Sequence, residues 1–565
     1  MQSQEAALRV YKRGLAAPLV FLGSVGAGWG SVDASPVTWS VALVLLGAGA
    51  YVMKSGLPSA PGLMSFAVLC YALVLVLNNV VLSPAYTPAA PFHAAFLVVG
   101  SAIGARLDDE GLGALGRLLA VGAGLLALWG LWQVSGGGAS RATAYFETPA
   151  TLAALINFAL LFVLARLALA APRWPWVALG VVLAAGLAST VSRGGMLALL
   201  AGLLVAAVAA RRAGLALSRR GVAAVAFVLA MGGMLAIAAN ALPSVRDASS
   251  NQALHLPLGA DARYSSVSRL ELYALAVDGI RARWVAGTGY LGFRSLLEAN
   301  RKAVPTFKDG DTYFVHNDFL QTLLELGIAG FLAFVAATLM PLVQGLRRAA
   351  TCRDKPLAVA MLSVIAGTVT LAMVDFPFYV PICLLFFGMA VGVLDRTIGG
   401  AVWLGLSAAP ALRRSAAIAA GAATALVLVP PLIADLAATY AHRAWRQADG
   451  QAAAYWFEVA RRFEARDWRY HWYAGQFWYV QAELTGKPAA ARLADAAFAE
   501  GMAANPVEVR NYLGRIATQR RFAGLLESPV NAEISRRWIA EAAALAPDHP
   551  GVRAELARLG AGVTR

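Results

Sequence analysis

Long apolar runs separated by short polar segments dominate this chain. A run of about 20 mostly apolar residues is long enough to cross a bilayer as a helix. Candidate spans lie at residues 15–31, 36–53, 61–82, 91–106, 113–134, 149–171, 174–191, 195–210, 220–240, 318–346, 356–375, 379–397 and 414–435. The pattern predicts an all-α polytopic membrane protein with about 12–13 transmembrane helices.

Two long polar segments interrupt this pattern, at residues 241–317 and 437–565. In the second segment, similar stretches begin at Asp467, Asn505 and Asp548. Their spacing of about 40 residues is near the period of tetratricopeptide-like helix pairs, so we expect a C-terminal α-helical repeat domain. The chain then divides into N-terminal transmembrane helices (1–134), a membrane core (135–400) that includes the loop 241–317, a last transmembrane helix (401–436) and the repeat domain (437–565).

Composition and charge agree with a membrane protein. The chain is 59% hydrophobic and 14% charged, whereas a globular domain is about 45–50% apolar and about 25% charged. Its net charge of +15 comes from short basic clusters between apolar runs, and residues 32–35 and 83–90 carry no Lys or Arg. This asymmetry predicts a cytoplasmic N-terminus and places both long segments on the opposite side of the membrane. No nucleic-acid-binding motif accompanies the charge, so we expect no nucleic-acid partner.

A histidine stands where the long loop meets the tenth span. A neutral imidazole at His316 would be able to take a proton from a hydroxyl group near pH 7. The alternative interpretation is that this segment only caps the helix, with Asn317 or Asp318 accepting the first backbone amides. Gly327 and Gly330 follow within the same span, and we interpret them as packing residues that let another helix approach.

Two arginines stand out on the same side of the membrane. Arg193 lies in the Ser-Arg-Gly-Gly turn between two spans, and Arg269 lies in the sequence Ser-Arg-Leu-Glu-Leu-Tyr, where we expect it to open an amphipathic helix capped by Ser268. Arginine binds phosphate through two parallel hydrogen bonds and stays charged. The alternatives are an Arg193 that reaches to the interface and a solvated Arg269. Arg263 and Asn317 are further candidates for binding the substrate.

Taken together, these residues resemble the O-antigen ligase superfamily. The resemblance rests on His316-Asn317-x9-Gly327-x2-Gly330, on the Ser-Arg-Gly-Gly turn and on Arg269, with a looser likeness in the stretch that begins at Arg141; it covers about residues 135–400. It implies transfer of a glycan from undecaprenyl diphosphate to an acceptor at the outer leaflet of the bacterial inner membrane, with neither metal nor other cofactor. It also implies that Arg193 and Arg269 hold the diphosphate and that His316 is the base.

The resemblance leaves several acceptors open. We expect an O-antigen ligase whose acceptor is lipid A-core, with the active site and the C-terminal domain facing the periplasm. A protein O-oligosaccharyltransferase would instead use an exported protein such as pilin, and a docking role for the repeat domain favours it. An O-antigen polymerase would use the growing glycan. A transporter of lipid-linked glycan and a scaffold for other envelope proteins are alternatives from other classes. In every case membrane lipid surrounds the protein.

Overall fold

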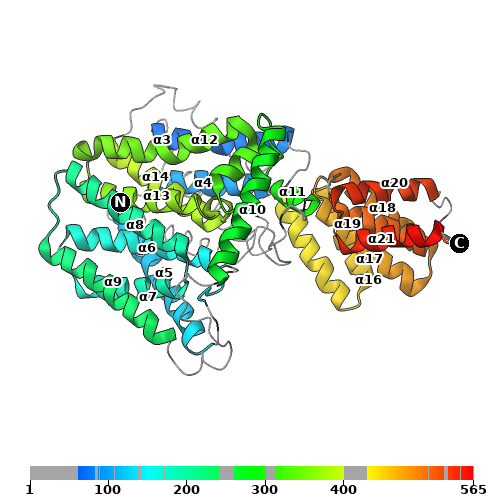
Figure 1. The fold of residues 1–565 in the computed structure, drawn as a ribbon, viewed down its shortest axis with the longest axis horizontal. Helices are drawn as coiled ribbons and strands as arrows, with labels where there is room; N and C mark the ends of the chain where they lie inside the picture. Colours follow the sequence, from blue (N-terminus) through cyan, green and yellow to red (C-terminus); the bar gives the residue numbers. More distant parts are fainter. Residues whose placement is uncertain are drawn as a thin grey trace, which may run out of the picture.

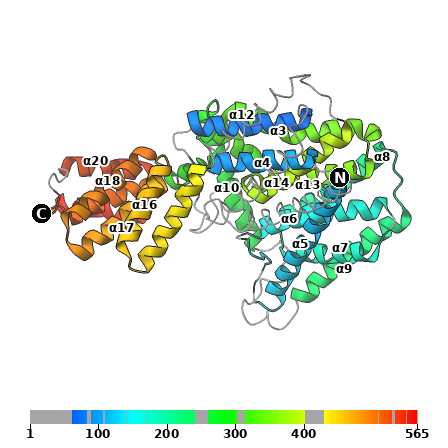
Figure 2. The same ribbon diagram turned by 180° about the vertical axis from the view of Figure 1, so that it is seen from behind.

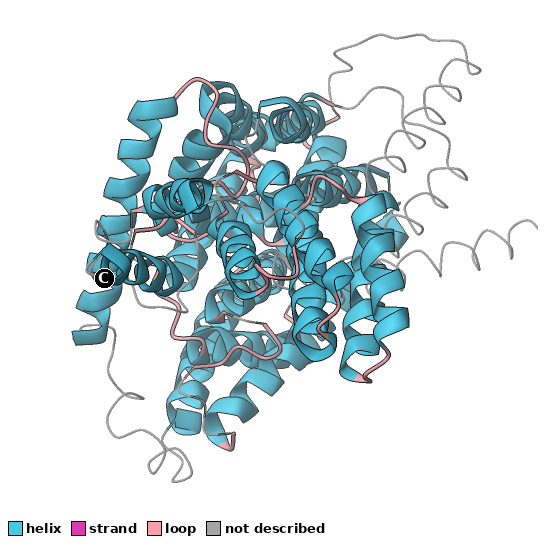
Figure 3. Cartoon of the chain, turned by 90° about the vertical axis from the view of Figure 1, so that its right-hand side faces the viewer, coloured by secondary structure: helices cyan, strands magenta, loops and turns pink. Residues whose placement is uncertain are grey.

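The computed structural model gives an all-helical protein within the residues that it describes (Figure 1, Figure 3). The described residues are 62–82, 87, 89–106, 109–137, 139, 141–146, 148–170, 172–240, 260–300, 304, 314–399, 429–506, 508–526, 532–547 and 549–563. The predicted spans at 15–31 and 36–53, and most of the one at 414–435, lie outside them. In the described part of the chain, 8 helices are long and apolar enough to cross a membrane. The protein is therefore a multi-pass membrane protein.

The helices of the membrane core follow the predicted spans. They are α3 (Leu63–Leu77) with the π-helical turn η1 (Asn78–Leu82), α4 (Ala89–Arg106), α5 (Asp109–Ser135), α6 (Pro149–Leu169), α7 (Trp174–Ser189), α8 (Arg193–Arg212), α9 (Arg219–Asn240), α12 (Asp318–Arg348), α13 (Lys355–Ala372) and α14 (Pro381–Ile398). Short 3-10 turns η4 (Ala349–Thr351) and η5 (Pro377–Tyr379) flank α13. The apolar runs thus predicted these ten helices to within a few residues.

Helices α4 and α14 are in close contact because both carry glycines one turn apart. A side chain at Gly100 or Gly104 of α4 would collide with the backbone of α14, and one at Gly388 or Gly392 of α14 would collide with the backbone of α4. Small residues at such spacing let membrane helices approach until their backbones touch. Figures 1 and 2 show α3, α12 and α13 running alongside this pair.

The loops of the membrane core lie at the two opposite ends of its helices. Connections α5–α6, α7–α8 and α13–α14 meet at one end, which we call the site end, together with the start of α12. At the other end, which we call the basic end, helices finish or begin with cations. These are Arg166, Arg211, Arg212, Arg219, Arg220, Arg347, Arg348, Arg353, Lys355 and Arg396.

Helix α12 is broken at Gly327. This glycine has φ 65° and ψ −167°, a backbone conformation that L side chains rarely adopt. The loop after α10 crosses the break: the Thr288 amide donates to Leu324 O at 2.9 Å, and the Ile328 amide donates to Trp284 O at 2.9 Å. A side chain at Gly327 would collide with the Val285 carbonyl. At Gly327 the approaching segment is therefore a loop, whereas the sequence predicted another helix.

The long polar loop and the C-terminal segment also form helices. The loop contains α10 (Ala260–Arg283) and α11 (Phe293–Ala299). After a helix over residues 429–446, the C-terminal segment forms α16 (Gly450–Phe463), α17 (Trp468–Thr485), α18 (Pro488–Ala504), α19 (Val509–Arg521), α20 (Ala532–Leu545) and α21 (Pro550–Val563). These helices stand beyond the site end, where α11 contacts α20 and Arg466 Nη2 donates to Val80 O at 3.2 Å (Figure 1, Figure 2). Their membership of the tetratricopeptide type stays a prediction.

Candidate functional site

The turn before α8 is held in place by its own polar side chains. Ser192 caps α8, because its Oγ accepts the Gly195 amide at 3.1 Å. Asn157 of α6 donates to the Gly195 carbonyl at 2.9 Å. Arg193 is the first residue of α8, so this turn fixes its backbone at the site end.

A second arginine folds over the same turn. Arg141 lies between α5 and α6; its Nε donates to Thr190 O at 2.9 Å and its Nη2 to Val191 O at 3.3 Å. Burial lowers the pKa of the Arg141 guanidinium, and the nearby Arg269 and Arg193 cations lower this pKa further. The Asp375 carboxylate acts in the opposite direction and raises it. These influences mean that three guanidinium groups and one carboxylate share one region.

Arg269 reaches the site from α10. Its Nη1 donates to Val374 O at 3.0 Å, which ties α10 to the end of α13. The expectation that Arg269 opens this helix was wrong: α10 begins at Ala260, so Ser268 lies inside it and is no cap. Arg263 is on the same helix, but its side chain is outside the described residues, and its role stays a prediction.

His316 precedes α12 in a left-handed backbone conformation, with φ 59°. Its carbonyl accepts the Tyr273 hydroxyl at 3.0 Å. Its ring lies against Phe376, with centroids 5.1 Å apart, and Nδ1 is 3.4 Å from Asp375 Oδ1. The ring therefore faces the α13–α14 connection. The hydrogen bond from Tyr273 of α10 holds the strained backbone of His316 in this position.

The capping interpretation holds for the neighbour of His316. Asn317 Oδ1 accepts the Leu320 amide at 3.0 Å and caps α12. Asp318 is buried, and its Oδ2 accepts the Phe378 amide at 2.9 Å. Both residues thus fix the start of α12 against η5, and substrate binding by Asn317 remains a prediction.

Asp375 is a site residue that sequence reasoning missed. It is buried between α13 and η5, and its Oδ1 also accepts the Phe376 amide at 3.0 Å. Burial raises the pKa of the Tyr273 phenol, a shift that Arg269 opposes and Asp375 reinforces. The available signal in the sequence was a lone acid at one end of a predicted span, where an unpaired charge is costly.

The buried carboxylate of Glu325 joins the elements that carry this site. Glu325 of α12 accepts four hydrogen bonds: from the amides of Leu291 and Phe293 at 3.0 and 3.3 Å, from Gln321 Nε2 at 3.1 Å and from the Tyr379 hydroxyl at 2.8 Å. Four donors satisfy a carboxylate in a low-dielectric interior. Glu325 therefore binds α12, η5 and the loop before α11 into one unit around His316.

The family model Wzy_C, described as O-Antigen ligase, matches residues 178–335. Residues 178–335 belong to the O-antigen ligase superfamily. The matched segment contains Arg193, Arg269 and His316, whereas Arg141 and Asp375 lie outside it and are brought to it by the fold. A search among curated proteins finds no match to the chain.

The candidate site has the composition of an anion-binding site. Three arginines share this region with the buried Asp375, whose carboxylate lies next to His316. Arginine forks match the oxygens of phosphate groups and do not lose their charge. Among the residues that the structure describes, no group of His, Cys, Asp and Glu side chains is arranged to hold a metal ion. An anionic leaving group at this end of the membrane would therefore meet guanidinium groups.

Proposed function

We propose that the protein is an O-antigen ligase of the bacterial inner membrane that moves a glycan from undecaprenyl diphosphate to lipid A-core at the periplasmic face. One observation carries the proposal: Arg141, Arg193, Arg269, His316 and Asp375 meet at the site end. The cations of the basic end support the orientation, because cytoplasmic loops are the ones enriched in Lys and Arg.

The proposed reaction is a direct displacement. The acceptor hydroxyl oxygen attacks the anomeric carbon of the first sugar, and the bond from that carbon to the diphosphate oxygen breaks. The bonding electrons leave with undecaprenyl diphosphate, and the hydroxyl proton passes to His316. A single displacement inverts the anomeric configuration, which analysis of the product anomer tests. Retention would contradict this step.

Arg193 and Arg269 neutralise the charge that grows on the leaving diphosphate. Preorganised cations aimed at developing charge typically contribute several kcal/mol to such reactions. Arg141 is tied by its own hydrogen bonds to the turn that carries Arg193. It therefore adds positive potential and fixes the turn.

Asp375 orients the base. Its Oδ1 faces Nδ1 of His316 at 3.4 Å, so a proton on Nδ1 leaves Nε2 to accept the proton of the acceptor. The buried carboxylate also stabilises the imidazolium that forms. Hydrogen bonds of this kind are often long before substrate binds and tighten afterwards.

Protein glycosylation is the second candidate function. It is favoured by the C-terminal helices, which stand beyond the site end and contact α11. A helical domain at that position is suited to present an exported protein to His316. The chemistry of the site is the same for both acceptors, because each supplies a hydroxyl group.

A reconstituted transfer assay tests the proposal and separates the acceptors. Purified protein receives undecaprenyl-diphosphate glycan with lipid A-core in one reaction and pilin in another, each with EDTA. His316→Ala and Arg193→Ala run in parallel. Transfer to lipid A-core that both substitutions slow strongly would support the ligase. Transfer to pilin alone would support the second candidate. No transfer by the wild type to either acceptor would count against both.

A further inference from the structure

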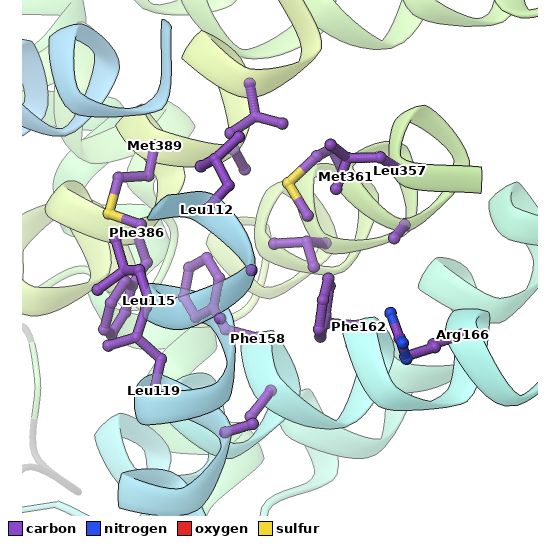
Figure 4. Close-up of a pocket in the computed structure, with 18 of the residues that line it drawn as sticks. Leu112, Leu115, Leu119, Phe158, Phe162, Arg166, Leu357, Met361, Phe386 and Met389 are labelled. Carbon is purple, nitrogen blue, oxygen red and sulfur yellow. The ribbon is translucent and has the colours of Figure 1, made fainter. Parts of the chain in front are cut away.

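A large apolar cavity lies in the membrane core away from the candidate site. It has a volume of about 390 Å³ and lies between α5, α6, α13 and α14 (Figure 4). Its walls include Leu115 and Leu119, the rings of Phe158 and Phe162, Met361 and Phe386. Ligand pockets typically have volumes of about 300–1,000 Å³ and mostly apolar walls. The cavity thus has the size and chemistry of a site for part of a lipid.

The cavity opens toward the basic end. Arg166, near the end of α6, and Asp354, which caps α13, both lie on its rim. Asp354 Oδ1 accepts the Leu357 amide at 3.1 Å. Arg166 is exposed, and its guanidinium lies 5.1 Å from the centroid of the Trp176 ring. Figure 4 shows Arg166 at the edge of the cavity, beyond Phe162.

The large cavity and the candidate site lie toward opposite ends of the helices. Two smaller cavities lie between them: one shares Phe158 and Val364 with the large cavity, and the other borders Asp375. Each of the two has a volume of about 10 Å³, which is about the space of one water molecule. Neither of these two small cavities has room for a prenyl tail. Arg166 and Asp354 place one end of the large cavity at the basic end, which favours entry of its occupant from there.

We propose that this cavity binds an acyl chain of an anionic glycerophospholipid from the leaflet at the basic end, with the lipid phosphate at Arg166. Apolar walls favour the chain because filling an apolar void restores lost contacts. The cations of the basic end favour an anionic headgroup. This inference does not rest on the proposed function, because it concerns a different site at the opposite end of the helices.

The test is native mass spectrometry of the full chain. The protein is taken from nanodiscs that contain equal parts of phosphatidylcholine and phosphatidylglycerol with a trace of undecaprenyl diphosphate. Gly116→Leu fills the cavity; a Cβ there would have Phe162 as its nearest neighbour, at 3.6 Å. Arg166→Gln removes the cation. The matched controls are Gly233→Leu, where a Cβ would meet nothing within 4 Å, and Arg220→Gln at the basic end.

We expect the wild type and both controls to retain phosphatidylglycerol. Retention should fall about tenfold in Gly116→Leu, and in Arg166→Gln the preference over phosphatidylcholine should fall about tenfold. Equal retention in all variants would overturn the proposal, as would a wild type that carries no lipid. Cavity-dependent retention of undecaprenyl diphosphate would overturn it in favour of the donor tail. Arg166→Gln keeps the test informative if Gly116→Leu does not fold.

Discussion

Replacing Asp375 by asparagine isolates the contribution of its charge to transfer. At the 3.4 Å separation from His316 Nδ1, attraction to an imidazolium is about 5 kcal/mol at an effective dielectric constant of about 20, and about 1 kcal/mol in bulk water. The His316 side chain is 19% exposed and that of Asp375 is 7% exposed. We therefore expect a loss of about 2–3 kcal/mol, which slows transfer about 30- to 150-fold. The asparagine oxygen is still able to accept the Phe376 amide, so the fold should persist.

A double-mutant cycle decides whether Asp375 acts through His316. Transfer rates are measured for Asp375→Asn, His316→Ala and the double variant, with thermal unfolding as a check on folding. Asp278→Asn, which changes an exposed acid of α10, is the matched control. We expect the double variant to be no slower than His316→Ala. If the slowing factors of the two single variants multiply in the double variant, Asp375 does not act through His316. That result, or an Asp375→Asn variant as fast as the wild type, would refute the role of Asp375 as an orienting group.

The remaining predictions concern phosphate binding, the helix break, pH and metal. Arg193→Lys keeps the charge but loses the fork, so donor binding should weaken about tenfold in a titration of transfer rate against donor; unchanged binding would contradict the phosphate contact. Gly327→Ala should destabilise the protein by about 1–3 kcal/mol in thermal unfolding, because φ is 65° there; an unchanged midpoint would count against the break. Burial, with the Asp467 carboxylate, raises the pKa of Glu464 to about 7, so its protonated form is favoured in the folded state. Stability should fall by at most about 3 kcal/mol as pH rises from about 4.5 to about 7. Glu464→Gln should remove that fall, and an unchanged pH profile would contradict it. EDTA should leave transfer unaffected; restoration of a lost activity by added metal would refute metal independence.

Apolar periodicity was sufficient to predict the membrane helices, because a span must bury a whole run of apolar side chains. It did not predict the break in α12. The local sequence pattern is the same for a glycine that lets a helix approach and for one that adopts φ 65°. The difference at Gly327 comes from the loop at residues 284–288, which crosses α12 there. The start of α10 was misplaced for a related reason: Ser268 is a favoured capping residue type, but the helix already begins at Ala260.

The candidate site was predictable where a residue type was unusual for its position. Arg193, Arg269 and His316 are polar groups at membrane boundaries, and the fold brings the elements that carry them together at the site end. Asp375 was not predictable, since its importance comes from facing His316 across 59 residues of sequence. Glu325 was missed for the same reason, because its four donors come from three separate segments.

The glycine contact between α4 and α14 also has a consequence for biosynthesis. Roughly 290 residues separate Gly100 from Gly388, and a ribosome needs on the order of 15–60 s to add them at about 5–20 residues per second. During that time α4 resides in the bilayer without its partner, and its glycine face is covered only by lipid or by insertion factors. Completion of the membrane core must therefore wait for nearly the last transmembrane segment to emerge. A chain truncated before α14 would leave that face open to the membrane's quality-control proteases.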